Sequence, residues 1–299
     1  DMKHTHTSIQ IVIPTYEAAP SLLKTIESIE KQSIYDDISE IIIYLDGKKK
    51  ISTLFKNIEY KKIRIIESSE RKGHAYGLQK LFETATADLV IQTNDDVILH
   101  PKAVEEIVRT FEKTRADLIT TSMQPMKAKN VFQHILKEAK EIDKNMIQNM
   151  KENTFLTCNG RLLGLSRKHY STIQIPMSLH NVDAFEYITT QENKMRHAHC
   201  QKAILFYRLP KTLNEHLKQS LKFQYSATEN QFYFKNDIKK YYSIPKQVAI
   251  RAVMSRFFEN PLGVVLALGM IVYTRIQKSN APTRNQKGYW ITDVSTKEI

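Results

Sequence analysis

The chain of 299 residues is 41% hydrophobic and 25% charged, a composition typical of a folded protein with room for one large domain and an appendage. Its two cysteines, Cys158 and Cys200, lie in no CxxC or Cys/His spacing, which argues against a disulfide scaffold or a cysteine zinc site. The net charge of +12 is uneven: residues 1–126 carry 17 Lys and Arg against 19 Asp and Glu, and residues 127–299 carry 27 against 13. The basic half favours an anionic partner, such as nucleic acid, lipid headgroups or a diphosphate, the alternative being a solvated basic face.

Apolar β-branched segments alternate with segments of helical spacing through the first half of the chain. The pattern predicts strands at residues 8–15, 40–45, 62–66, 88–93 and 116–122, and helices at 21–32, 73–84 and 102–113. Strands that are apolar on both faces and alternate with helices are typical of an α/β fold, with a mostly parallel sheet flanked by helices. In such sheets, ligands bind beyond the carboxyl ends of the strands.

The second half of the chain is less regular. Its pattern predicts helices at residues 131–152, 168–172 and 212–223, and strands at 157–166 and 203–208. We therefore predict a domain at residues 1–225, divided into halves at 1–126 and 127–225, and a C-terminal appendage at 226–299.

Candidate ligand-binding residues stand at the ends of three predicted strands. They are Pro14, Thr15, Tyr16 and Glu17 at the first strand, Asp46 at the second, and Asn94, Asp95 and Asp96 at the fourth. Two adjacent carboxylates are costly to place together without a cation, and Mg2+ and Mn2+ prefer oxygen ligands. The alternatives are a turn-forming Asp46-Gly47 pair and a solvated acidic turn at 94–96.

Taken in order, these motifs resemble those of family 2 glycosyltransferases of the GT-A fold. Members of that family open with a VIPTYN-like strand, place an acid after the second strand, and carry a basic glycine-containing helix start before a DxD metal motif. The matching segments here are VIPTYE at 12–17, Asp46, RKGHAYGLQ at 71–79, and NDD at 94–96 followed by Pro101. The resemblance spans roughly residues 8–225.

The resemblance implies a donor site for a nucleotide sugar in residues 1–126. Asn94 and Asp96 fall on the two DxD positions and would hold Mg2+ or Mn2+, with Asp95 as an alternative ligand. Asn replaces the first Asp of the motif, which is a departure from the family. The remaining donor-binding residues that the resemblance implies are Pro14, Thr15, Tyr16, Glu17, Asp46, Arg71, Gly73 and His74.

The resemblance also implies an acceptor site in residues 127–225. The segment at 158–168 is similar to the family's acceptor-side strand, and Asp183 falls where members carry the presumed base of an inverting transfer, with Glu186 as a second candidate. The alternative for Asp183 is a helix N-cap. The QSLKF sequence at 219–223 is similar to the QxxRW motif of membrane-associated members. Its diphosphate and acceptor residues would be Gln219, Lys222 and Phe223.

The appendage holds a candidate membrane anchor. Residues 245–260 have amphipathic spacing with basic side chains, and residues 261–274 form an uncharged stretch of 14 residues. Such a stretch is short for a full span and favours an interfacial anchor. We therefore expect attachment to the cytoplasmic face of an anionic membrane through residues about 245–275. The alternative is a helix buried against the catalytic domain, a second copy or a membrane-protein partner.

Taken together, the resemblance implies an inverting, metal-dependent transferase that moves a sugar from a nucleotide sugar to a glycan or lipid-linked acceptor. UDP is the commonest nucleotide in the family, and GDP remains open. Three alternatives remain. The first is a polyprenyl-phosphate sugar transferase. The second is a catalytically silent GT-A module, suggested by Asn94. The third is a nucleic-acid binder, which ranks last because no nucleic-acid-binding motif is present and because strand-end acids repel phosphate without a metal ion.

Overall fold

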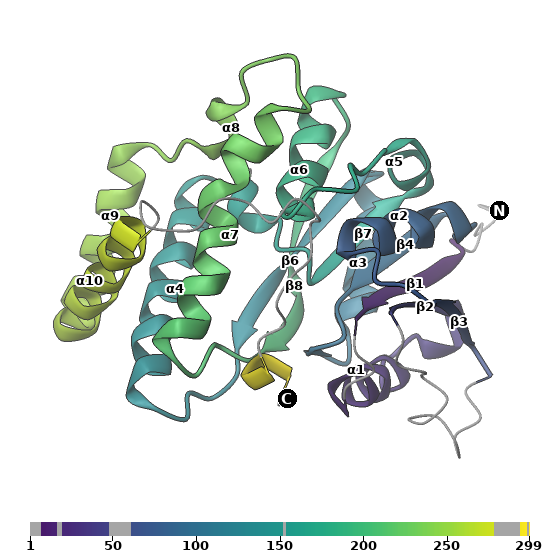
Figure 1. Cartoon of the computed structure of the whole chain (residues 1–299), viewed down its shortest axis with the longest axis horizontal. Helices are drawn as coiled ribbons and strands as arrows, with labels where there is room; N and C mark the ends of the chain where they lie inside the picture. Colours follow the sequence, from purple (N-terminus) through teal and green to yellow (C-terminus); the bar gives the residue numbers. More distant parts are fainter. Residues whose placement is uncertain (1–6, 17–19, 48–60, 152–153, 278–293, 298) are drawn as a thin grey trace.

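A computed structural model describes residues 7–16, 20–47, 61–151, 154–277, 294–297 and 299. The described chain forms a mixed sheet with helices on both faces, and the last helices lie side by side at the opposite edge of the molecule from β1–β3 (Figure 1). The predicted α/β fold, a sheet flanked by helices, is confirmed. The sheet contains more antiparallel pairings than the sequence predicted, since three of its seven neighbouring pairs are antiparallel.

The sheet has the strand order β3-β2-β1-β4-β7-β6-β8-β5 in the described chain. Its strands are β1 (Ile9–Thr15), β2 (Ile38–Asp46), β3 (Ile63–Ser68), β4 (Leu89–Thr93), β5 (Val97–Leu99), β6 (Leu118–Pro125), β7 (Leu162–Ser166) and β8 (His197–Tyr207). Strands β1 to β4 pair in parallel, so that the carboxyl ends of β1, β2 and β4 meet at one edge of the sheet. The predicted polar strand ends therefore lie together.

Two apolar cores lie on opposite faces of the sheet. Helices α1 (Pro20–Glu30) and α3 (Ala103–Thr114) cover one face. The other face is covered by α2 (His74–Thr84), α5 (Arg167–Thr172) and α6 (Val182–Glu192). Every residue of β1 and of β4 is buried, as expected for strands with a helical layer on each face.

The second half of the sheet is built differently from the first. Strand β7 lies antiparallel between β4 and β6, and β8 pairs in parallel with β6. The strand expected at 157–166 begins only at Leu162, because the chain forms a short 3-10 turn at Phe155–Thr157 and Gly160 has a positive φ of 65°. The strand expected at 203–208 begins earlier, at His197, where polar residues pair with β6.

The C-terminal region of the described chain is helical. Helix α4 (Val131–Asn149) packs against α9 (Lys246–Glu259) and α10 (Pro261–Gln277), with α7 (Leu213–Gln231) and the short α8 (Lys239–Tyr242) between them in the chain. The expected boundary at residue 225 falls inside α7, and the expected boundary after residue 126 falls just after β6. No helix of the described residues is both long and apolar enough to cross a membrane.

Candidate active site

Asp46 connects the end of β2 to the start of α2. Its side chain is almost fully buried, and its two carboxylate oxygens accept the backbone N–H groups of Lys72 at 2.5 Å and Gly73 at 2.8 Å. Gly73 stands at φ 100°, a conformation that favours glycine, directly before the first residue of α2, His74. Each carboxylate oxygen can accept a second hydrogen bond, so the same group can bind a ligand hydroxyl.

Tyr16 and Arg71 stack where β1 and β2 end. The guanidinium carbon of Arg71 lies 3.7 Å from the centre of the Tyr16 ring. Gly47, at φ 116°, lies along the same ring, since a Cβ added there would be 3.4 Å from it. Of the predicted donor residues, Pro14 is buried in β1 and Glu17 lies outside the described residues. The structure thus brings Tyr16, Arg71 and Asp46 to one edge of the sheet.

An acid loop, defined here as Asn94, Asp95 and Asp96, lies between β4 and β5. Asp95 is buried; it accepts a hydrogen bond from Thr15 Oγ1 at 2.5 Å on one oxygen and pairs with Lys297 on the other. Burial raises the pKa of Asp96, while the positive charges of Lys297 and Arg161 lower it. Asp96 Oδ1 is buried and accepts no hydrogen bond from the described residues.

The acid loop fits a divalent cation. An uncompensated buried carboxylate oxygen is costly, and a cation would satisfy it. Asp95 is already engaged by Thr15 and Lys297, so Asp96 and the amide oxygen of Asn94 are the better ligands. No group of three or more His, Cys, Asp or Glu in the described chain could hold a metal alone. Donor phosphates and water would complete the shell, as is usual for Mg2+.

Asp183 lies in the first turn of α6 and is 8% exposed. The N-cap of this helix is Asn181, whose side chain accepts the Ala184 N–H, so the alternative role of Asp183 as the N-cap is wrong. The carboxylate lies against the backbone of Gly160: a Cβ added to Gly160 would be 2.0 Å from Asp183 Oδ1. Cys158 Sγ donates to the backbone oxygen of Asp183 at 3.1 Å. The carboxylate therefore occupies space that only glycine leaves open.

Strand β4 supports both the acid loop and the surroundings of Asp183. Gln92 Nε2 donates to the Gly160 carbonyl at 3.4 Å, and Thr93 Oγ1 donates to the Arg161 carbonyl at 2.8 Å. The acid loop follows Thr93 directly. The predicted base and the predicted metal ligands thus share one rigid support.

Glu186 lies one turn after Asp183 and is fully buried. Burial and then the charge of Asp183 raise the pKa of Glu186 well above its usual range, and the neighbouring Gln92 amide lowers it. Neither carboxyl oxygen makes a hydrogen bond of normal geometry with the described residues, which is costly for a charged group and much less so for a neutral acid. A neutral acid cannot accept a proton, so this environment disfavours Glu186 as a second base.

The Glu186→Gln variant is expected to be more stable than wild type by a margin that grows with pH. The folded wild type keeps a proton that the unfolded chain releases above about pH 4.3, so its stability falls as the pH rises above that value. Glutamine has no such proton to lose. Thermal unfolding of both proteins between pH 4 and pH 8 measures the margin, and a constant margin would show that Glu186 ionises alike in both states.

Helix α7 carries the QSLKF segment. Gln219 is partly buried and Phe223 is 57% exposed, while the side chain of Lys222 lies outside what the structure describes. The helix begins with a capping box: the side chains of Thr212 and Glu215 each accept a hydrogen bond from the backbone N–H of the other residue. Glu215 also accepts a hydrogen bond from Ser295 Oγ at 2.7 Å.

Two cations of the site were missed by sequence reasoning. Lys297 is 202 residues from Asp95 in the chain, and no local pattern connects them. Arg161 lies beside Asp96, with its guanidinium 4.5 Å from the centre of the Tyr207 ring. The signal that could have found Arg161 was its place after Gly160, in a segment already matched to the acceptor-side strand. Both cations contribute to the +14 charge of residues 127–299.

The model of the family described as "Glycosyl transferase family 2" matches residues 10–173, which is more than half of the chain. The chain belongs to glycosyl transferase family 2. Asp46, the acid loop and Gly160 lie in the matched segment, whereas Asp183 and α7 lie after it.

Individual proteins similar to this family 2 chain include hyaluronan synthases. Those of Streptococcus pyogenes and of its serotype M1 are each 30% identical over 112 residues, which cover 34% of this chain and 26% of the synthase. The alignment thus spans about a quarter of the length of these relatives. A solved structure of a mannosyltransferase from Pyrobaculum calidifontis, in complex with GDP-Man and Mn2+, has a TM-score of 0.61 at 13% identity and covers 93% of this chain and 76% of that one. This likeness shows the shared fold.

Proposed function

We propose that the protein transfers a sugar from a nucleoside-diphosphate sugar to a glycan or lipid-linked acceptor, with inversion at the anomeric carbon and with Mg2+ or Mn2+ bound at the acid loop. The observation that carries the proposal is the buried Asp96 oxygen beside Asn94, at the carboxyl end of β4, in a family 2 chain. The mannosyltransferase of similar fold was solved with GDP-Man and Mn2+, which supports a nucleotide sugar and a divalent ion.

In this proposal each part of the site has one task. Asp46, with Tyr16 and Arg71, binds the nucleoside, because these groups meet at the sheet edge. A divalent ion on Asp96 and Asn94 would supply Lewis-acid stabilisation of the departing diphosphate. Arg161 and Lys297 add positive charge beside the acids. Asp183, held over Gly160, accepts the proton of the acceptor hydroxyl as that oxygen attacks. A single displacement of this kind inverts the anomeric centre.

The test is a transfer assay on the purified chain. The chain is incubated with UDP-sugars and GDP-sugars, Mn2+ and candidate glycan or polyprenyl-phosphate acceptors, and released nucleotide and product are measured. Product on a glycan acceptor supports the proposal, and product on a polyprenyl phosphate alone favours the first alternative. A folded chain that binds nucleotide but transfers and hydrolyses nothing would be the silent module.

We further propose that α9 and α10 attach the chain to the cytoplasmic face of an anionic membrane. One face of this helix pair packs on α4 through Ala252, Val264 and Ala267. The Arg256–Glu138 ion pair, at 2.8 Å and largely buried, fixes it there. The outer surface is apolar and exposed, with basic side chains among it: Ile250, Phe258, Leu262, Val265, Val272 and Ile276, with Lys246, Arg251 and Arg275. Such a surface suits anionic headgroups.

Vesicle co-sedimentation tests this attachment. Wild type is expected to pellet with phosphatidylcholine vesicles that contain an anionic lipid, and Phe258→Asp to pellet less. Val131→Asp is the matched control, because Val131 is an equally exposed apolar residue on α4, outside the apolar surface. Wild type that stays in the supernatant with every vesicle would contradict the proposal, and a concentration-dependent dimer would instead favour a second copy as the partner.

A further inference from the structure

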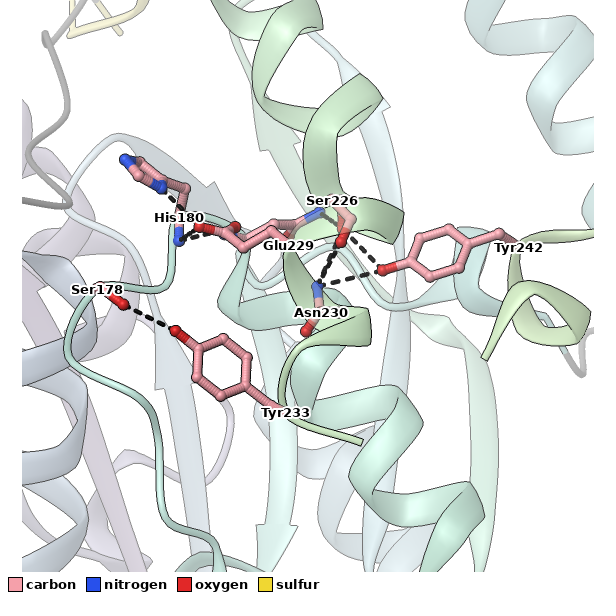
Figure 2. A network of polar contacts seen from close by, with 8 residues as sticks. Ser178, His180, Ser226, Glu229, Asn230, Tyr233 and Tyr242 are labelled. Carbon is pink, nitrogen blue, oxygen red and sulfur yellow. Dashed lines mark hydrogen bonds and ion pairs between the residues drawn. The ribbon is translucent and has the colours of Figure 1, made fainter. Parts of the chain in front are cut away.

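The carboxylate of Glu229, on α7, binds the turn that leads into α6. It is 7% exposed and accepts the backbone N–H of His180 at 3.1 Å on both oxygens. It also accepts a hydrogen bond from His180 Nδ1 at 2.6 Å (Figure 2). The Asn181 N–H donates to the same carboxylate at 3.4 Å. One carboxylate therefore fixes two consecutive backbone amides and one ring. Charge-assisted bonds of this kind are stronger than neutral ones.

A second set of hydrogen bonds attaches the same turn to α7. Asn181 Nδ2 donates to Ser226 Oγ at 2.8 Å, and that hydroxyl is 2.8 Å from the Tyr242 hydroxyl. Asn230 Nδ2 donates to the Ser226 carbonyl at 3.0 Å and to the Tyr242 hydroxyl at 3.2 Å (Figure 2). Because Ser226, Glu229 and Asn230 lie within about one turn of α7, the turn at His180–Asn181 rests on a single rigid surface.

The turn held by Glu229 sets the start of the helix that carries the proposed base. Asn181 is the N-cap of α6, and Asp183 follows two residues later. On the other side, α7 carries Gln219 ten residues before Glu229, a separation of about 15 Å along one helix. The QSLKF segment on α7 and the proposed base on α6 are thus connected through α7 and the carboxylate of Glu229.

We propose that Glu229 is a positioning residue for Asp183: through the His180–Asn181 turn it fixes the base relative to the QSLKF segment of α7. The inference rests on the proposed function, since it assigns Asp183 the role of base. The effect is expected on the chemical step, because a misplaced base lowers the rate of proton transfer without changing the donor site. The donor site lies at the ends of β1, β2 and β4, on other elements.

The chain offers a matched control in Glu192. This glutamate is the last residue of α6 and connects that helix to the segment after α7. It accepts a hydrogen bond from the Tyr241 hydroxyl at 2.6 Å and another from Asn236. It lies nine residues after Asp183, about 13 Å along the helix. Loss of Glu192 would loosen the C-terminal end of α6 from that segment without moving the first turn of α6.

The experiment compares Glu229→Gln and Glu192→Gln with wild type in the transfer assay. Glu229→Gln is expected to lower kcat by about 10- to 100-fold, the size expected for a displacement of about 1 Å, with the donor KM and the Mn2+-dependent nucleotide affinity unchanged. Glu192→Gln is expected to keep the wild-type kcat. An unchanged kcat in Glu229→Gln, or an equal loss in both variants, would overturn the inference.

Hydrogen–deuterium exchange provides a readout that needs no activity. In Glu229→Gln the amides of residues 180–183 are expected to exchange faster than in wild type, whereas those at the C-terminal end of α6 are not. If wild type transfers no sugar, the proposed function fails, yet the exchange still decides whether Glu229 holds the turn. Unchanged exchange at 180–183 would overturn the positioning role whatever the activity.

Discussion

Asp183→Asn is expected to lower kcat for sugar transfer by about 100- to 10,000-fold, the range that a positioned general base contributes. Asparagine keeps the size and most of the contacts of the carboxylate over Gly160, so the fold should persist. It cannot accept the proton of the acceptor hydroxyl at neutral pH. Nucleotide binding should be unchanged, because the acid loop and Asp46 lie on β4 and β2.

The measurement is a steady-state transfer assay with nucleotide titrations on the same samples. Asp143→Asn serves as the control, because Asp143 lies on the surface of α4, where it pairs with Lys140 at 2.8 Å. A wild-type kcat in Asp183→Asn would show that Asp183 takes no part in the chemical step. Loss of nucleotide affinity together with kcat would instead mean that Asp183 belongs to the donor site.

Gly160→Ala is expected to lower kcat by at least about 100-fold and to destabilise the fold by about 1–3 kcal/mol. The added Cβ would stand 2.0 Å from Asp183 Oδ1, so either the carboxylate or the loop must move. The φ of 65° at Gly160 is also strained for alanine. The loss of stability and the loss of kcat are expected together, because the added Cβ displaces the carboxylate of the proposed base.

Gly269→Ala is the matched control for this substitution. Gly269 lies inside α10, and an added Cβ there meets nothing within 4 Å, so alanine should be neutral or stabilising by about 0.5–1 kcal/mol. Thermal unfolding and the transfer assay on both variants give the comparison. A Gly160→Ala protein with the stability and kcat of wild type would show that the carboxylate does not need the space above this residue.

The donor edge of the sheet was predictable because the strands and the polar residues at their ends are local features of the sequence. Strands β1, β2 and β4 are mostly apolar, and polar residues stand at or just beyond the carboxyl end of each. Parallel pairing then brings those ends together, so Thr15 and Asp95 meet although 80 residues separate them. The family resemblance added the roles of Asp46 and the acid loop, which the polar residues alone left open.

What the sequence could not predict depends on tertiary contacts. The first half of β8 is polar and pairs with β6, where Thr120 Oγ1 hydrogen-bonds to the rings of His197 and His199, so alternation alone did not reveal it. The three residues of β5 are too few for a periodic signal. Lys297 reaches the acid loop from the far end of the chain. The neutral environment of Glu186 follows from burial that only the packed helix α6 creates.

Calorimetric titration of UDP and GDP, with and without Mn2+, tests the donor site most directly. Wild type is expected to bind one of the two nucleotides in a Mn2+-dependent manner, and Asp96→Ala to lose that dependence, because its buried oxygen is the proposed ligand. Asp36→Ala, which removes an exposed acid, should bind as wild type does. Binding of neither nucleotide by folded wild type, or Mn2+-dependent binding that persists in Asp96→Ala, would contradict a metal-assisted donor site at the acid loop.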